Sequence, residues 1–171
     1  MEKIKRELNQ VFWILVYFIL IWFIFAIIIP FTIMPNQGFI KTEIQETENL
    51  RNFAEQFKGE TKEQTLFNVF NYTTTTYTGV DERLKLAFLY HKHFYYNIEK
   101  MVNKKQFLSC HVQNNLIKTI LINSGQFTKN DIKNVLVITR YFTAHQYLVV
   151  QIDENIKYKV DSFFRIIERI N

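Results

Sequence analysis

The 171-residue chain contains one cysteine, four glycines and two prolines. A single cysteine excludes a disulfide within the chain, and it leaves Cys110 as a free thiol whose role needs an explanation. A single cysteine therefore does not indicate whether the protein resides in a reducing or an oxidising compartment. The scarcity of glycine and proline is typical of a compact chain with few long loops.

A basic surface stripe is also missing, although the net charge is +5. A nucleic-acid surface would need clustered Lys and Arg with interleaved aromatic side chains, whereas the basic residues here are scattered, so no nucleic-acid partner is expected. With 48% hydrophobic and 22% charged residues, the composition indicates one folded domain plus an appendage.

The appendage is an unbroken apolar run over residues 11–29. About 19 helical residues extend about 28 Å, which matches the hydrocarbon thickness of a bilayer. A buried core helix is seldom apolar on every face for this length, and a cleaved signal peptide would end in small residues, whereas Pro30 and Pro35 follow here. We therefore predict an uncleaved transmembrane anchor over residues 11–34, with the lipid bilayer as partner.

Charges on the two sides of this run predict its orientation. Basic residues at positions 3, 5 and 6 precede it, whereas glutamates dominate the segment that follows. Basic flanks stay in the cytoplasm. We therefore expect residues 1–10 in the cytoplasm, residues 35–46 as a linker and residues 47–171 as the extracytoplasmic domain of a single-pass membrane protein.

Helical periodicity dominates the first half of this domain. Thr47 can cap a helix that Gly59 ends, and Thr61 has capping-box spacing for a second helix that ends at Gly79. Asp81 begins a third helical stretch that continues to residue 96, and one or two further turns follow over residues 98–104.

Cys110 lies at the predicted first turn of a helix within residues 107–125. Ser109 is a good N-cap because its hydroxyl can accept from a backbone N–H that the first turn leaves unpaired. The partial positive charge of a helix N-terminus favours thiolate over thiol, which is one route to a nucleophilic cysteine. The alternative is the commoner role of a single cysteine in apolar surroundings, that of a small buried hydrophobic side chain.

Two histidines, His91 and His93, invite a metal site. Residues i and i+2 point to different faces of a helix, and no third ligand has the spacing to complete a site, so neither a metal nor another cofactor is expected. His111 follows Cys110 directly and would point elsewhere on the helix, which makes it a poor general base for the thiol.

After Gly125 the periodicity becomes that of strands. Residues 135–142 and 145–152 are rich in β-branched and aromatic side chains, and residues 157–160 alternate into a third strand that forms a hairpin with the second. The last apolar residues of the chain would pack back on this sheet.

The hairpin brings together two ionisable side chains. A loop centred on Asp153 would place His145 opposite Asp161 on one face of the sheet. The carboxylate would then accept one ring N–H and fix the tautomer, while the other ring nitrogen reaches the thiol.

The order of the three candidate residues resembles that of the transglutaminase-like superfamily, a rearranged relative of the papain fold. The cysteine stands at a helix start, the histidine at the head of a strand and the aspartate one hairpin later. The resemblance rests on the cysteine helix and on the segments FAEQFKGETKEQTLFNVFNYTTTTY, IEKMVNKK, HQYLVVQID and YKVDSFF. The chain departs from the family pattern beside each residue. The family has glycine shortly before the cysteine, tryptophan two residues after the histidine and often proline after the aspartate, where this chain has Leu108-Ser109, Tyr147 and Ser162.

The resemblance implies an α+β domain, with helices packed on a small antiparallel sheet, and it implies Cys110 as nucleophile, His145 as base and Asp161 as orienting acid. The expected function is that of a membrane-tethered thiol enzyme acting on amide bonds of a peptide or protein substrate, as peptidase, amidase or transamidase, through a Cys110 thioester. The altered flanking residues and the abundant aromatic side chains favour an alternative, a catalytically inactive binding or assembly module of the same fold. A third interpretation is a structural membrane protein with an unrelated small domain.

Overall fold

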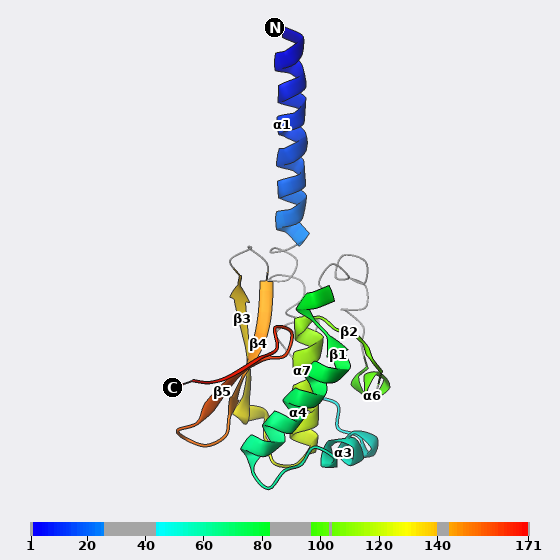
Figure 1. Cartoon of the computed structure of the whole chain (residues 1–171), viewed down its shortest axis with the longest axis vertical. Coiled ribbons are helices and arrows are strands. Elements are labelled where there is room, and N and C mark those ends of the chain that lie inside the picture. The colour runs from blue at the N-terminus through cyan, green and yellow to red at the C-terminus, as the bar shows by residue number, and fades with distance from the viewer. Residues whose placement is uncertain (1, 26–43, 83–96, 103, 140–143, 171) are drawn as a thin grey trace.

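A computed structural model describes residues 2–25, 44–82, 97–102, 104–139 and 144–170 (Figure 1). The described chain has one long N-terminal helix, a group of shorter helices and two small sheets, so the predicted α+β class is confirmed at that level. The long helix stands apart from the other elements, which lie together at its C-terminal end (Figure 1).

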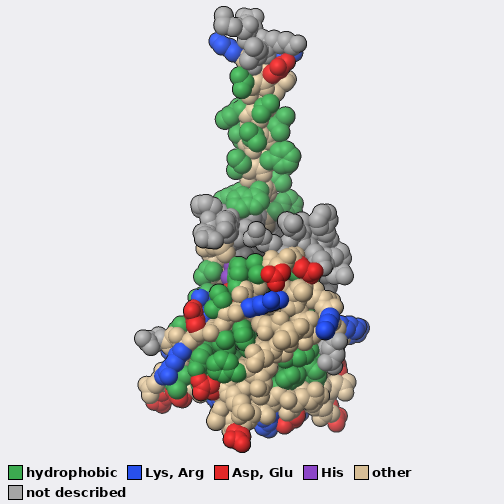
Figure 2. All heavy atoms as spheres, viewed as in Figure 1, with side chains coloured by type: hydrophobic (Ala, Val, Ile, Leu, Met, Phe, Trp, Pro, Cys, Tyr) green, Lys and Arg blue, Asp and Glu red, His purple; other side chains and the backbone are tan. Residues whose placement is uncertain are grey.

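Helix α1 (Glu2–Phe23) is long and apolar enough to cross a membrane. None of its 19-residue stretch Lys5–Phe23 is buried against the described rest of the protein. Apolar side chains surround the helix, and charged ones gather at its N-terminal end (Figure 2). The helix begins nine residues before the predicted anchor at position 11, so the basic flank continues the same helix.

Helices α3 (Glu48–Glu55) and α4 (Lys62–Thr76) form where the sequence predicts them. The Thr47 hydroxyl accepts from the N–H of Leu50, and the Thr61 hydroxyl accepts from the N–H of Gln64. The predicted capping box is not reciprocal, because the Gln64 side chain accepts from the backbone of Glu60 rather than from that of Thr61.

Short elements lead from α4 to the cysteine. Strand β1 (Tyr77–Thr78) pairs in parallel with β2 (Gln106–Phe107), the 3-10 helix η3 (Val80–Glu82) follows β1, and α6 (Ile98–Met101) precedes β2. The helical stretch predicted to begin at Asp81 is a 3-10 turn as far as residue 82. Its remainder, with His91 and His93, lies outside the described residues.

Helix α7 (Cys110–Asn123) occupies the centre of the domain. It contacts strand β4 on one side and α3, α4 and α6 on others, and nearly all of its side chains are buried. Burying one large aliphatic side chain stabilises a fold by about 1.5–3 kcal/mol. Four of them on α7 are almost completely buried: Leu116, Ile117, Ile120 and Leu121. The position of Cys110 is therefore set by the main core.

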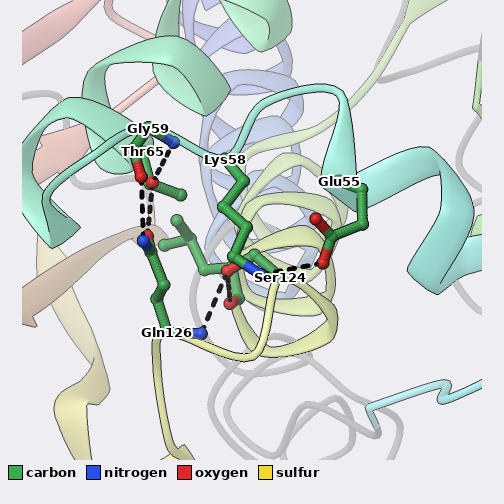
Figure 3. A network of polar contacts seen from close by, with 7 residues as sticks. Glu55, Lys58, Gly59, Thr65, Ser124 and Gln126 are labelled. Carbon is green, nitrogen blue, oxygen red and sulfur yellow. Dashed lines mark hydrogen bonds and ion pairs between the residues drawn. The ribbon is translucent and has the colours of Figure 1, made fainter.

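The far end of α7 is fixed by a polar network (Figure 3). After Gly125, which has a positive φ of 76°, the Gln126 amide donates to the carbonyl of Gly59 at 2.9 Å and accepts from the Thr65 hydroxyl. The Thr65 hydroxyl in turn accepts from the N–H of Gly59 at 2.8 Å. This network ties the loop between α3 and α4 to the end of the cysteine helix.

Four antiparallel strands form the larger sheet in the order β3-β4-β5-β6. The 3-10 helix η5 (Lys129–Asp131) leads into β3 (Ile132–Ile138), which β4 (Ala144–Gln151), β5 (Lys157–Asp161) and β6 (Ile166–Ile170) follow. Strand β6 was not predicted, and it adds an edge strand beyond the expected hairpin of β4 and β5.

The segment that precedes α3 already contacts the domain. The Gln45 side chain accepts from the backbone N–H of Ile98 at 3.1 Å, and the Gln45 carbonyl accepts from the Asn123 amide at 2.8 Å. Residue 45 falls in the predicted linker, but its hydrogen bonds join it to α6 and to the end of α7.

Candidate active site

His145 and Asp161 lie in direct hydrogen-bonding contact, with Nε2 of His145 2.6 Å from Oδ2 of Asp161. The strand register that produces this contact differs from the predicted one. Leu148 pairs with Val160. Continuing this register by one residue along each strand places Asp161 beside Tyr147, which is two residues from His145. A shift of two residues keeps side chains on the same face, so the histidine and the carboxylate still meet on a diagonal.

The register follows from the loop between β4 and β5. Oδ1 of Asp153 accepts from the backbone N–H groups of Asn155 and Ile156, and Ile152 donates to the carbonyl of Ile156. This side-chain turn centres the loop on Glu154, one residue later than expected.

Asp161 is held by the turn that follows β5. Its second oxygen, Oδ1, accepts from the N–H of Phe164 at 3.2 Å, and the turn closes at Arg165 with a positive φ of 59°. The Phe163 carbonyl accepts from the N–H of Val80, which fastens the turn to η3. Both carboxylate oxygens are thus engaged, and the side chain has little freedom to leave His145.

Cys110 lies at the start of α7, where Phe107 and Phe163 pack around it. The thiol is 9% exposed. Burial raises the pKa of Cys110, but hydrogen bonds from His111 and His145, together with the charges of both rings, outweigh it and lower the pKa to about 6. These contacts favour the thiolate form of the side chain.

The pKa of His145 shifts in the opposite direction. Burial lowers its pKa, but the hydrogen bond to Asp161 and the contact with Cys110 raise it to about 9. The ring of Phe164 lies edge-on to the imidazole, with the centroids 4.8 Å apart. Because Asp161 occupies Nε2, Nδ1 is the ring nitrogen left for the sulfur. A thiolate–imidazolium pair with an orienting carboxylate is suited to nucleophilic attack and proton transfer.

Two expectations about the residues beside Cys110 are wrong. Ser109 occupies the N-cap position but makes no side-chain cap hydrogen bond, and its Oγ lies 3.1 Å from Nδ1 of His111 instead. His111 is not remote from the thiol, since its ring is one of the groups that lower the pKa of Cys110.

Sequence reasoning missed two amides that place the cysteine helix. The Gln113 side chain donates to the carbonyls of Thr78 and Leu108, and the Asn114 side chain donates to the carbonyl of Gln146 at 2.9 Å. Asn114 thereby ties α7 to the strand position next to His145. The available signal was the run of three carboxamides, Gln113-Asn114-Asn115, one turn after the cysteine and directly before an apolar helix segment.

Metal ligands do not gather in the described part of the chain. No group of three or more His, Cys, Asp or Glu side chains there could hold a metal ion, and His91 and His93 lie outside it.

Comparisons with protein families, with curated proteins and with solved structures found no match to this chain.

Proposed function

We propose that this chain is a membrane-tethered thiol enzyme of the transglutaminase-like type, which acts on amide bonds of a peptide or protein. The observation that carries the proposal is the convergence of Cys110, His145 and Asp161 from α7, β4 and β5. The 2.6 Å contact between His145 and Asp161 supports it, as does the hydrogen bond between the thiol and His145.

The chemistry follows from the ion pair. The Cys110 thiolate attacks the amide carbonyl carbon and forms a C–S bond, while the backbone N–H of Cys110 at the helix end stabilises the developing oxyanion. The imidazolium of His145 gives its proton to the nitrogen as the C–N bond breaks, which leaves a thioester and a free amine. Water or a second amine then attacks the thioester, loses its proton to His145 and releases the thiolate.

Asp161 serves this cycle without touching the substrate. Its carboxylate holds the Nε2 proton of His145 and supports the positive charge on the ring, so Nδ1 keeps facing the sulfur. With water as second nucleophile the protein is a peptidase or amidase, and with an amine it is a transamidase.

Helix α1 anchors the enzyme in this proposal. The basic residues at its N-terminal end favour a cytoplasmic N-terminus, so the domain with Cys110 acts outside the cytoplasm.

Burial of the thiol favours a second candidate, an inactive binding or assembly module. Only 9% of Cys110 is exposed, and a binding module would have no need to admit a substrate to it. The two candidates differ in the reactivity of the thiol.

The pH dependence of alkylation separates them. We expect the full chain in detergent micelles to react with iodoacetamide with an apparent pKa of about 6, well below that of an ordinary thiol. His145→Ala should move this profile toward that of an ordinary thiol, and Cys110→Ala should abolish labelling. A folded protein whose thiol stays unreactive at neutral pH would sink the enzyme proposal and favour the binding module.

A further inference from the structure

Exposed apolar side chains of the domain lie at the end of the sheet that carries His145. Among the described residues after position 43, three large apolar side chains are exposed: Ile138, Phe164 and Ile166. Ile138 ends β3, Phe164 stands in the turn after β5, and Ile166 begins β6 directly opposite Asp161. Single exposed apolar side chains are ordinary, but several of them beside a reactive group indicate a binding surface.

Phe164 is the member of this group that contacts the histidine. Its ring lies edge-on to the imidazole of His145, with the centroids 4.8 Å apart, and the residue is still 39% exposed. Phe163 packs against it at 5.4 Å and belongs to the buried cluster that contains Cys110. Phe164 therefore forms the outer end of an aromatic group that begins beside the thiol.

The turn after β5 holds the Phe164 ring in place. The backbone N–H of Phe164 donates to Oδ1 of Asp161 at 3.2 Å, and the carbonyl of Phe163 accepts from the N–H of Val80 at 3.0 Å. An apolar surface that is already ordered loses little conformational entropy when a ligand covers it. The exposed ring is therefore prepared for binding.

The proton transfer indicates which part of a substrate lies here. In the proposed reaction His145 gives its proton to the departing nitrogen, which must come within hydrogen-bonding reach of the imidazole. The acyl group is bound to the sulfur of Cys110, so the group attached to the nitrogen is the one that lies beside Phe164. An amine that attacks the thioester occupies the same place, because its attack is the reverse of that departure.

We propose that Phe164, together with Ile166, is a specificity-determining residue that binds an apolar group on the amine side of the substrate amide. This inference rests on the proposed function and names its substrate class. The substrates are peptides in which an apolar or aromatic residue follows the cleaved bond, and the second amine of a transamidation carries such a group as well.

The experiment measures how an acetyl-enzyme divides between two amines. p-Nitrophenyl acetate acylates Cys110: a C–S bond forms, the C–O bond breaks and p-nitrophenolate leaves. Benzylamine and methoxyethylamine, which are similar in basicity, then compete for the thioester. Each forms a C–N bond as the C–S bond breaks, and gives a proton to His145. We expect the full chain in detergent micelles to prefer benzylamine by about tenfold, because an aromatic pair adds to the effect of the apolar area that it buries.

Substitutions at Phe164 test the source of this preference. Phe164→Ala should abolish it, whereas Phe164→Leu keeps a smaller apolar surface and should retain part of it. Both variants keep the backbone N–H that holds Asp161. Ile138→Ala is the matched control, because it also shortens an exposed apolar side chain at this end of the sheet. Val137, and not Ile138, pairs with His145, so Ile138 faces the other side and its variant should keep the wild-type preference.

Circular dichroism establishes that each variant is folded. A folded Phe164→Ala chain with the wild-type preference would overturn the inference, as would an acetyl-enzyme that reacts with both amines alike or with neither. If Phe164→Ala does not fold, Phe164→Leu decides, and an undiminished preference there overturns the inference equally. A release of nitrophenolate that is no faster than in Cys110→Ala removes the proposed function and the inference with it.

The bilayer is the other possible occupant of this surface, and fluorescence detects it. Phe164→Trp is combined with Trp13→Phe and Trp22→Phe, so that one tryptophan remains, and the chain is reconstituted in vesicles of brominated phosphatidylcholine. We expect no quenching of the tryptophan at the site. Quenching would assign the surface to the membrane and overturn the inference.

Discussion

Nε2 of His145 lies 2.6 Å from Oδ2 of Asp161, and the two residues are 6% and 4% exposed. A charged hydrogen bond this well shielded from water is stronger than its surface equivalent. It joins neighbouring strands on a diagonal, so the site depends on the sheet register as well as on the residues themselves.

Removing the charge of Asp161 should weaken the thiolate without removing the side chain. In Asp161→Asn the amide oxygen can still accept from His145, but the imidazolium loses its counter-charge and its pKa falls by about 1–2 units. Thiolate and imidazolium coexist between the pKa of Cys110, about 6, and that of His145, about 9. The lower pKa of His145 should bring the upper limit of this interval down. The pKa of Cys110 should rise, because the imidazolium that stabilises the thiolate is weakened.

The measurement is the pH profile of alkylation at Cys110. Asp153→Asn is the matched control, because Asp153 also accepts from backbone N–H groups in a turn but lies at the exposed end of the hairpin, and asparagine keeps the accepting Oδ1 that forms the loop. An unchanged profile in Asp161→Asn would show that the carboxylate is structural only.

Asn114 should couple the cysteine helix to the histidine strand. In Asn114→Ala the carbonyl of Gln146 loses its donor at 2.9 Å, which costs about 1–3 kcal/mol in the free energy of unfolding and lets β4 move away from α7. We expect a lower melting temperature together with a raised pKa of Cys110.

Asn123→Ala is the control for this prediction. Its amide also makes buried hydrogen bonds on α7, to the carbonyls of Gln45 and Thr119, but at the opposite end of the helix. It should lower the melting temperature and leave the thiol titration unchanged. A similar thiol pKa in both variants would mean that the Asn114 bond stabilises the fold without placing His145.

Gly79 should tolerate no side chain. A methyl group there would lie 2.5 Å from the carbonyl oxygen of Phe163, which is backbone and belongs to the turn that holds Asp161. Overpacking of this kind costs about 1–3 kcal/mol. Gly79→Ala should therefore destabilise the protein and slow alkylation of Cys110 at neutral pH.

Gly125→Ala provides the comparison, since it strains a residue with φ of 76° by about 1–2 kcal/mol but has open space around it. Thermal unfolding should detect both variants, whereas only Gly79→Ala should alter the reactivity of the thiol. Equal changes in the alkylation rate of Cys110 in the two variants would contradict a specific role of Gly79 in holding the turn at Asp161.

Helix α1 should behave as a membrane anchor. Placing arginine at Leu15 and Ile19 together costs about 2.5–3.5 kcal/mol per residue near the centre of a span. This double variant should be released from membranes by alkaline carbonate, whereas the wild type and an alanine pair at the same positions should remain. Carbonate release of the wild type would exclude the anchor.

The predicted orientation has its own measurement. A phosphatase fused to the C-terminus, which is active only outside the cytoplasm, should be active. A fused reporter that works only in the cytoplasm should be silent, and the reverse pattern would place the domain on the cytoplasmic side.

Local signals in the sequence predicted the elements well, because they act over a few residues. The threonines at 47 and 61 cap their helices as expected, and the hairpin of β4 and β5 forms where the alternation predicts it. Strand β6 was missed because its sequence, IIERI, alternates poorly and is mostly exposed at the edge of the sheet.

Long-range placement was less predictable. The meeting of His145 with Asp161 was expected, but through a register displaced by two residues, since the turn chemistry of Asp153 decides the loop. The contact of the Ser109 hydroxyl with His111 could not be foreseen from the helix pattern, which predicts a bond from that hydroxyl to the first turn instead. Local rules fail where side chains bind each other instead of the backbone.

The order of the site residues along the chain has a consequence for biosynthesis. Cys110 leaves the ribosome before His145 and Asp161, and at about 5–20 residues per second the interval is roughly 3–10 s. During that time the nascent thiol has neither the imidazole of β4 nor the carboxylate of β5 beside it, so its pKa is that of an ordinary cysteine. Under the proposed function, the thiol of a chain still being translated is therefore less reactive than that of the folded domain, and the site is complete only when the C-terminal strands join the sheet.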